Sequence, residues 1–208
     1  MVSPGQRSGW IAVTGLVLVL FLVAHLAGIA LAPFAPVAFT AYADALHRQS
    51  WLPLAELLLA AAGLAHPALS LAQAVADRRA RGAAPALLVS RRGDPLASFA
   101  SRTAAISGGL LLLFLGVHLL QLRLPRAAAG LELLQLRASL ASPAALVLYL
   151  AAALALGLHV FHGAEAAHRS LGLLEAANGS RIRRWGRGLA LLLAVGFALV
   201  PVLLVVRP

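Results

Sequence analysis

The sequence predicts an all-α membrane protein, with five transmembrane helices that form a single domain over residues 1–208. Two observations lead to this prediction, and a third limits the chemistry of the chain. Hydrophobic residues make up 61% of the chain and charged residues 12%, whereas soluble domains carry about 45–50% apolar and about 25% charged residues. Five apolar segments each contain 19 or more residues, and a helix needs roughly 20 to cross a bilayer. The chain has no cysteine, which excludes disulfides, iron–sulfur ligation and thiolate metal sites.

The helices are expected where apolar runs lie between prolines and arginine clusters. Their expected ranges are about 11–31, 52–76, 103–124, 143–167 and 188–206. The first run follows Arg7 and ends in Ala30-Leu31-Ala32, a pattern shared with signal peptides. It is longer than the apolar core of such a peptide (about 7–15 residues), and Pro33 follows the cleavage point, so we expect a retained helix. No internal repeat is evident beyond a bias toward Ala and Leu.

Arginine supplies all 17 basic residues and sets the expected orientation. The N-terminus and the second and fourth loops hold 12 of them, and the first loop, the third loop and the C-terminus hold 5. The 12 are Arg7, Arg78, Arg79, Arg81, Arg91, Arg92, Arg102, Arg169, Arg181, Arg183, Arg184 and Arg187. Because basic residues accumulate on the cytoplasmic side, we expect a cytoplasmic N-terminus and an external C-terminus. The net charge of +10 is attributed to this topology, with membrane lipid as the partner and no nucleic acid.

Each of the first four segments carries an internal histidine: His25, His66, His118 and His159. At a rise of about 1.5 Å per residue, His25 and His118 lie roughly 21–22 Å from the inner face. His66 and His159 are on helices that run the other way, and they lie roughly 21–24 Å from the outer face. In a hydrocarbon core about 30 Å thick, these depths give an outer pair and an inner pair, on the order of 10–15 Å apart.

Two facing imidazoles at one depth suit the axial positions of a haem iron held between helices. Small residues near the histidines leave room for a flat porphyrin; they include Gly28, Gly63, Gly116, Gly157 and Gly163. The alternatives are plain hydrogen-bonding helix contacts, a zinc site or a proton relay. The last two favour nearby carboxylates, but Glu56 and Glu165, the acids within the segments, lie close to helix ends. Without a Cys-x-x-Cys-His motif, we predict two non-covalent haem b groups.

Six stretches, in this order and spacing, carry a family resemblance. They read "TGLVLVLFLVAHLAG", "FTAYADALH", "WLPLAELLLAAAGLAH", "FASRTAAISGGLLLLFLGVHLL", "LGLHVFHGAEAAHRSLGL" and "IRRWGRGLALLLAVGFALVPV". Together they resemble the cytochrome b membrane anchor of succinate:quinone oxidoreductases (succinate dehydrogenase and fumarate reductase). The similar type has one anchor polypeptide, five helices and two haems. The resemblance covers nearly the whole chain, from about Ser8 to Val206.

The resemblance implies that the axial ligands pair first helix with third and second with fourth, as the depths also indicate. It implies a bacterial inner-membrane protein whose flavoprotein and iron–sulfur partner subunits bind on the cytoplasmic face. The substrate would be a membrane quinone, expected to be menaquinone. The chain itself is not expected to oxidise succinate, because it has neither a dinucleotide fingerprint nor cysteines for clusters.

Further site residues follow partly from the resemblance and partly from positions at the helix ends. On the fourth helix the family has a glycine four residues after the ligand, which selects His159 because Gly163 follows it; His162 is the second choice. Arg102 and the arginines at 181–187, Arg184 among them, are expected to pair with haem propionates or, equally, to set topology at the head groups. His47, Tyr42 and Glu56 are candidates for quinone contact near the outer interface, with interfacial capping as the alternative.

Two other functions are weighed. The chain could be the cytochrome b of another quinone-linked enzyme, a hydrogenase or formate dehydrogenase; the fifth segment and the depth-matched histidines count against it. It could be a non-redox transporter or scaffold that uses histidine for protons. Such a protein would carry acids in mid-membrane and broken helices.

Overall fold

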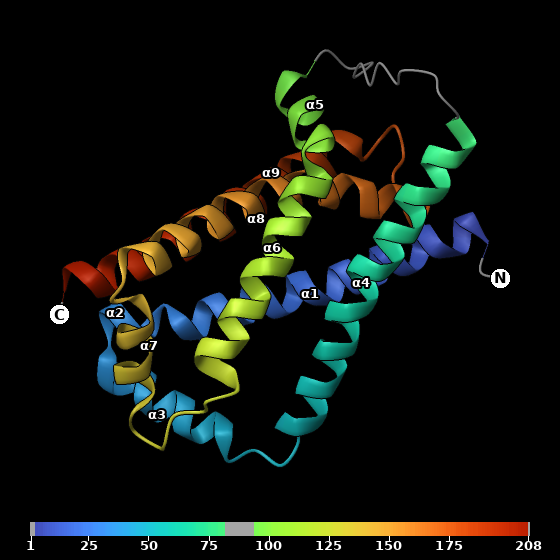
Figure 1. Ribbon diagram of the computed structural model, residues 1–208. Coiled ribbons are helices and arrows are strands. Elements are labelled where there is room, and N and C mark those ends of the chain that lie inside the picture. Colours follow the sequence, from blue (N-terminus) through green and yellow to red (C-terminus); the bar gives the residue numbers. More distant parts are fainter. Residues whose placement is uncertain (1–2, 82–93, 208) are drawn as a thin grey trace.

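The computed structural model describes residues 3–81 and 94–207, and all regular structure in this part is helical (Figure 1). The elements are α1 (Pro4–Ile29), α2 (Leu31–Phe34), α3 (Pro36–His47), α4 (Leu52–Arg81), α5 (Pro95–Arg102), α6 (Ala104–His118), the π-helical turn η1 (Leu119–Arg123), α7 (Glu132–Leu140), α8 (Pro143–Ser170) and α9 (Gly179–Val206). Arg91 and Arg92, counted above for topology, lie outside the described residues.

Five helical stretches in the described residues are long and apolar enough to cross a membrane. They are Gly5–Phe34, Leu52–Ala80, Ala104–Arg123, Pro143–Ser170 and Gly179–Val206. The prediction of an all-helical, multi-pass membrane protein with five spans is confirmed at this level. Many large apolar side chains on these helices are exposed, Leu20 and Leu64 among them, which is the pattern expected of surfaces that face lipid.

The helix bounds differ from the expected ranges mainly at their starts. α1 begins at Pro4, because Ser3 and Gln6 form a capping box that satisfies the first free N–H groups. α9 begins at Gly179, nine residues before the expected start, so its first turns carry the arginines that the sequence pattern places in a loop. The short helices α3, α5 and α7 lie in segments that were expected to be loops.

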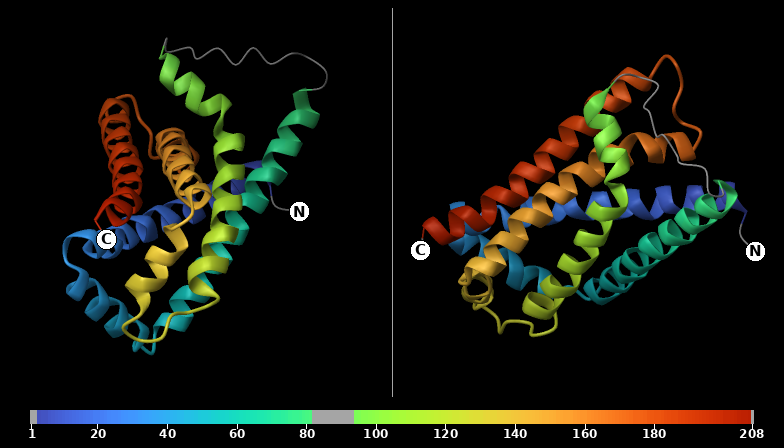
Figure 2. Two further views of the ribbon diagram at one scale, coloured as in Figure 1. Left: turned by 60° about the vertical axis from the view of Figure 1, so that its left-hand side comes forward. Right: turned by 45° about the horizontal axis from the view of Figure 1, so that its top comes forward.

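The two last long helices, α8 and α9, lie side by side along most of their length (Figure 2). Small residues allow the two backbones to approach. A Cβ added at Gly157 would lie 2.8 Å from the Ala194 Cβ, and one added at Gly186 would lie 2.7 Å from the Ala164 Cβ. Around this pair, α1 packs against α4 and α8, and α6 packs against α8.

The ends of the helices gather at two sides of the molecule (Figure 1). The start of α1, the end of α4, α5 and the connection from α8 to α9 lie at one side, which we call the N-side. The segments α2, α3 and α7 and the end of α9 lie at the other, the C-side. A buried cluster fills the C-side between α2, α3, α7 and α9; it contains Ala32, Phe39, Leu136, Leu140, Val200 and Leu204.

Candidate functional site: two pairs of histidine rings

The structure brings the four intramembrane histidines together in two pairs. His25 of α1 faces His118 of α6, with ring centres 6.1 Å apart and planes at 79°. His66 of α4 faces His159 of α8, with ring centres 6.2 Å apart and planes at 75°. We call the first the C-side pair and the second the N-side pair. These are the pairs given by the depth argument, and the ring that lies against His66 is that of His159, not His162.

In the N-side pair, the hydrogen bonds of His66 define which ring nitrogen carries the proton. Its Nδ1 lies 3.1 Å from the carbonyl oxygen of Ile11 and 3.2 Å from the hydroxyl oxygen of Thr14. A carbonyl oxygen only accepts, so Nδ1–H is the donor. In a neutral imidazole the other nitrogen, Nε2, then has a lone pair, which is the form that binds a metal.

His159 has the same kind of partner on the neighbouring helix. Its Nδ1 lies 3.3 Å from the hydroxyl oxygen of Ser107. That hydroxyl donates to the carbonyl of Ala104 at 3.1 Å, so its oxygen is left to accept from the ring. Glycine follows the hydroxyl residue in both helices. A Cβ at Gly15 would lie 3.0 Å from Cε1 of His66, and one at Gly108 would lie 3.2 Å from Cε1 of His159.

The C-side pair is supported differently. The Tyr149 hydroxyl donates to the side-chain oxygen of Gln121 at 3.2 Å and lies 3.3 Å from Nδ1 of His118. The hydroxyl oxygen is therefore placed to accept from Nδ1–H, which again leaves Nε2 with the lone pair. His25 instead lies between two aromatic rings, stacked on Phe21 at 5.3 Å and tilted against Phe197 at 5.9 Å.

The chemistry of these pairs is limited by what surrounds them. No group of three or more His, Asp or Glu side chains in residues 3–81 and 94–207 is placed to hold a metal ion. Two imidazoles complete the coordination of a metal only when something else supplies the remaining ligands. The pairs therefore fit a metal that arrives in a planar macrocycle, and they do not fit zinc bound by protein side chains alone.

The candidates for quinone contact lie at the C-side, where His47 is close enough to Glu56 to interact with its charge. The Glu56 carboxylate binds the guanidinium groups of Arg123 and Arg126. Nδ1 of His47 lies 3.8 Å from the buried carboxylate of Glu132. The Tyr42 ring packs on α1 instead: a Cβ at Gly28 would lie 2.7 Å from it.

At the N-side, one of the arginines at the start of α9 makes an ion pair across helices. Arg187 binds the carboxylate of Asp94, the N-cap of α5, and its guanidinium lies 5.0 Å from the centre of the Phe161 ring. The Asp94 carboxylate also accepts from the N–H of Ala97 at 3.0 Å. This backbone bond and then Arg187 hold the pKa of Asp94 below its usual value. Arg102 at the end of α5 and Arg184 near the start of α9 are exposed.

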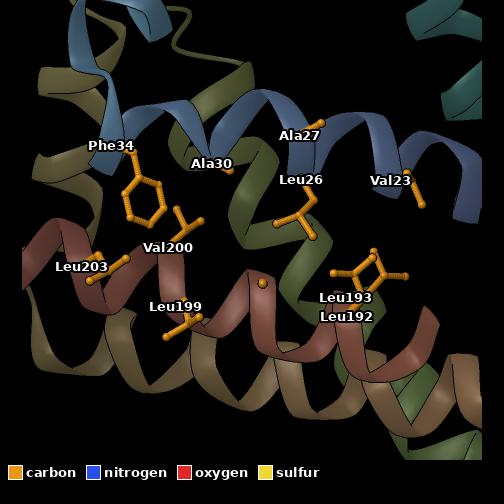
Figure 3. A pocket seen from close by; sticks show the side chains of 11 residues that line it. Val23, Leu26, Ala27, Ala30, Phe34, Leu192, Leu193, Leu199, Val200 and Leu203 are labelled. Carbon is orange, nitrogen blue, oxygen red and sulfur yellow. The ribbon is translucent and has the colours of Figure 1, made fainter. Parts of the chain in front are cut away.

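A groove of about 380 Å³ lies between α1 and α9 on the C-side half of the molecule (Figure 3). Val23, Leu26, Ala30 and Phe34 line one wall, and α9 residues, Leu199 and Leu203 among them, line the other. The lining contains no polar side chain, so the groove adds no group that could take part in chemistry.

The fold and the ring pairs thus define a class: a helical membrane protein that holds two pairs of facing histidines between four of its helices. Comparison of the chain with protein-family models, curated proteins and solved structures finds no match. The family resemblance stated above accordingly remains a prediction.

The sequence patterns did not identify the partners of the rings: Thr14, Gly15, Ser107, Gly108 and Tyr149. One signal was present. Thr14-Gly15 and Ser107-Gly108 precede His25 and His118, respectively, by the same number of residues. A hydroxyl residue and a glycine repeated at one distance from two histidines indicate a shared role, whereas each dipeptide by itself is common in membrane helices.

Proposed function

We propose that the chain is a dihaem cytochrome b membrane anchor of the succinate dehydrogenase and fumarate reductase type. It would conduct electrons between membrane quinone and the flavoprotein and iron–sulfur subunits, which would bind on one face of the membrane. The observation that carries the proposal is the separation of the ring centres, 6.1 Å in one pair and 6.2 Å in the other.

These separations match two imidazoles on one iron. Metal–imidazole bonds are about 2.0–2.1 Å long and the ring centre lies about 1.1 Å beyond the nitrogen, so axial rings have centres about 6.2–6.4 Å apart. Both ring planes contain the bond axis, and one can turn about that axis relative to the other. The interplanar angles of 79° and 75° are therefore compatible with ligation.

The protonation of the rings and the space beside them support the same proposal. In His66, His118 and His159 the nitrogen engaged by the protein is Nδ1, which is the usual arrangement when Nε2 binds the metal. A Cβ at Gly63, one turn before His66 on α4, would meet nothing within 4 Å. Open space on the same helix face as a ring is what a flat macrocycle requires.

In this function the four histidines hold the irons, and the helices around them exclude water. When bound, haem supplies reversible one-electron chemistry. On α1, Thr14 contacts His66 of the N-side pair and lies 11 residues before His25 of the C-side pair. At about 1.5 Å per residue, the two ring pairs are separated by about 16 Å along this helix. The pairs are thus stacked across the bilayer, which is the arrangement that electron conduction between its two faces needs.

The arginine distribution supports the orientation. The N-side carries α5 and the arginines at the start of α9, so we place it in the cytoplasm of a bacterial cell, under the partner subunits. Arg102 and Arg184 would bind haem propionates there. Quinone would react at the C-side, where His47, Tyr42 and Glu56 meet the membrane boundary. Labelling of sealed vesicles that places the start of α9 outside would reverse this assignment.

The test is a haem analysis of the purified protein. We expect a pyridine haemochrome assay to give two haem b groups per chain, and a reduced-minus-oxidised spectrum to show b-type bands. One haem or none would exclude the dihaem model. Purification from the native membrane distinguishes the family from other quinone-linked cytochromes b: the proposal requires flavoprotein and iron–sulfur subunits with succinate:quinone activity, not a hydrogenase or a formate dehydrogenase.

A further inference from the structure

The helices that carry the rings form two halves with one sequence register. Residues 93 positions apart have the same role: Thr14 and Ser107, Gly15 and Gly108, His25 and His118, His66 and His159. The register extends to identical residues in and around the stretches from the hydroxyl residue to the histidine on α1 and α6. These are Ala12 and Ala105, Leu18 and Leu111, Leu20 and Leu113, Phe21 and Phe114, Leu22 and Leu115, and Leu26 and Leu119. Five of these six identities are Ala or Leu, in which the chain is rich, so the shared register rests mainly on the histidines, the hydroxyl residues, the glycines and the pair Phe21 and Phe114.

The two halves also make the same contacts. Within the first half, the Thr14 hydroxyl lies 3.2 Å from Nδ1 of His66; within the second, the Ser107 hydroxyl lies 3.3 Å from Nδ1 of His159. Each ring also lies over the glycine that follows the hydroxyl residue. The ring pairs themselves form between the halves. α1 and α6 both run from the N-side towards the C-side (Figure 1), so the two halves have the same direction, as in transporters built from parallel repeats.

We propose that Thr14 and Ser107 are equivalent positioning residues, one in each half, that fix the tautomer and orientation of His66 and His159 as axial ligands. The proposal rests on the function proposed above. A serine or threonine in a helix commonly bonds the carbonyl one turn back, and both do so: Thr14 donates to Trp10 at 2.8 Å and Ser107 to Ala104 at 3.1 Å. That bond uses up the hydroxyl hydrogen, so the oxygen can only accept from the ring.

The equivalence of the two halves extends to a backbone partner of each ring. Nδ1 of His66 lies 3.1 Å from the Ile11 carbonyl oxygen, and the backbone of Ala104, the residue 93 positions further on, bonds the His159 ring. Removing either hydroxyl therefore leaves its ring with one backbone acceptor. Loss of an outer-shell partner of a ligating histidine typically lowers metal affinity about 10- to 100-fold. We expect a loss in this range for both Ser107→Ala and Thr14→Val.

The experiment is a titration of haem-free full-length protein with ferric haem, followed by absorbance, for the wild type, Ser107→Ala and Thr14→Val. Ser107→Thr and Thr14→Ser keep the hydroxyl and are the matched controls. A His25→Ala background leaves the N-side pair as the one intact pair. In it, we expect Ser107→Ala to bind haem about 10- to 100-fold more weakly and Ser107→Thr to bind like the parent. The single variant Ser107→Ala, without the His25→Ala change, should still bind haem at the C-side pair, which shows that it folds.

A second readout does not depend on haem. In haem-free protein with ¹⁵N-labelled histidine, NMR distinguishes Nδ1–H from Nε2–H rings. We expect Nδ1–H at His159 in the wild type, a smaller share of that form in Ser107→Ala, where the Ala104 backbone alone remains as a partner, and recovery in Ser107→Thr. Unchanged affinity and an unchanged tautomer in Ser107→Ala would overturn the positioning role, even if the wild type binds two haems. A wild type that shows the Nδ1–H form but binds no haem would overturn the proposed function, and the assignment of axial-ligand positioning with it.

Discussion

The N-side and C-side ring pairs have nearly the same separation but different support. His66 and His159 are each held by a hydroxyl from the neighbouring helix and lie over a glycine. In the C-side pair, His118 contacts Tyr149, whereas His25 lies between Phe21 and Phe197. Equivalent positions in the two halves therefore give a symmetric pair at one level and an asymmetric pair at the other.

The difference teaches how each pair is oriented. A hydrogen bond to Nδ1 fixes both the rotation of the ring and its tautomer. Aromatic stacking restrains the ring plane but leaves the choice of protonated nitrogen open. Hydrogen bonds thus fix the orientation and tautomer of both rings in the N-side pair. The orientation of the His25 ring depends on its packing between aromatic side chains. Four changes test this contrast, in order of decreasing effect.

The largest effect is expected from removal of a ring. His66→Ala should cost the N-side haem and His25→Ala the C-side haem, so that each variant retains one haem per chain instead of two, because an iron with one axial ligand is poorly held. Haem content by pyridine haemochrome and optical spectra of the remaining centre provide the measurement. His162→Ala is the control and should retain both haems. If His162→Ala loses a haem while His159→Ala keeps both, His162 is the fourth-helix ligand.

Filling the glycine contact comes next. A valine at 108 would place its Cβ 3.2 Å from Cε1 of His159, whereas a Cβ at Gly109 meets nothing within 4 Å. Overpacking typically costs about 1–3 kcal/mol, which corresponds to roughly 5- to 150-fold in affinity for haem at the N-side pair. Gly109→Val is the matched control one residue away. Equal affinities of the two variants in a ferric haem titration would show that the ring does not need this space.

A smaller and more local change is Tyr149→Phe. It removes the hydroxyl between His118 and Gln121 while keeping the ring that packs against Phe114. We expect about tenfold weaker haem binding at the C-side pair and a shifted spectrum for that centre. The spectrum of the N-side centre is the internal control. An effect at the N-side pair instead would contradict the separation of the two levels.

The smallest effect extends the comparison to the ion pairs at the helix ends. The folded state lowers the pKa of Asp94. The ionised Asp94 carboxylate therefore contributes its full stabilisation when the pH is above its pKa in the unfolded chain, about 3.9. This stabilisation is lost as the pH falls through the lower pKa of the folded state. We expect the thermal unfolding temperature of the wild type to fall slightly more than that of Asp94→Asn over this acidic range. Parallel pH profiles would show that the contact with Arg187 adds nothing.

The sequence was informative where a residue type is rare in its surroundings. A histidine in an apolar run is conspicuous, and helix geometry converts its position into a depth, so His25 and His118 could be paired without a structure. Ser107 and Thr14 could not be found in this way, because hydroxyl side chains occur throughout membrane helices and bond their own backbone. Their role depends on a partner helix whose rotation the sequence pattern does not define.

Helix ends were predicted less well, for a related reason. The arginines from Arg181 to Arg187 resemble a loop by composition, but their long side chains reach water from a helix, and α9 begins at Gly179. Glu132 also escaped notice. It is buried at the start of α7, a helix that lies in a segment expected to be a loop.

The close packing of α9 has a consequence for biogenesis. α9 supplies no histidine of the two pairs, yet Phe197 covers the His25 ring and a Cβ at Gly196 would lie 2.6 Å from Leu26. During synthesis α9 leaves the ribosome after the four helices that carry the rings. We therefore expect the C-side pair to be open to the bilayer until α9 docks, which would give the proposed haem a route of entry that α9 then closes.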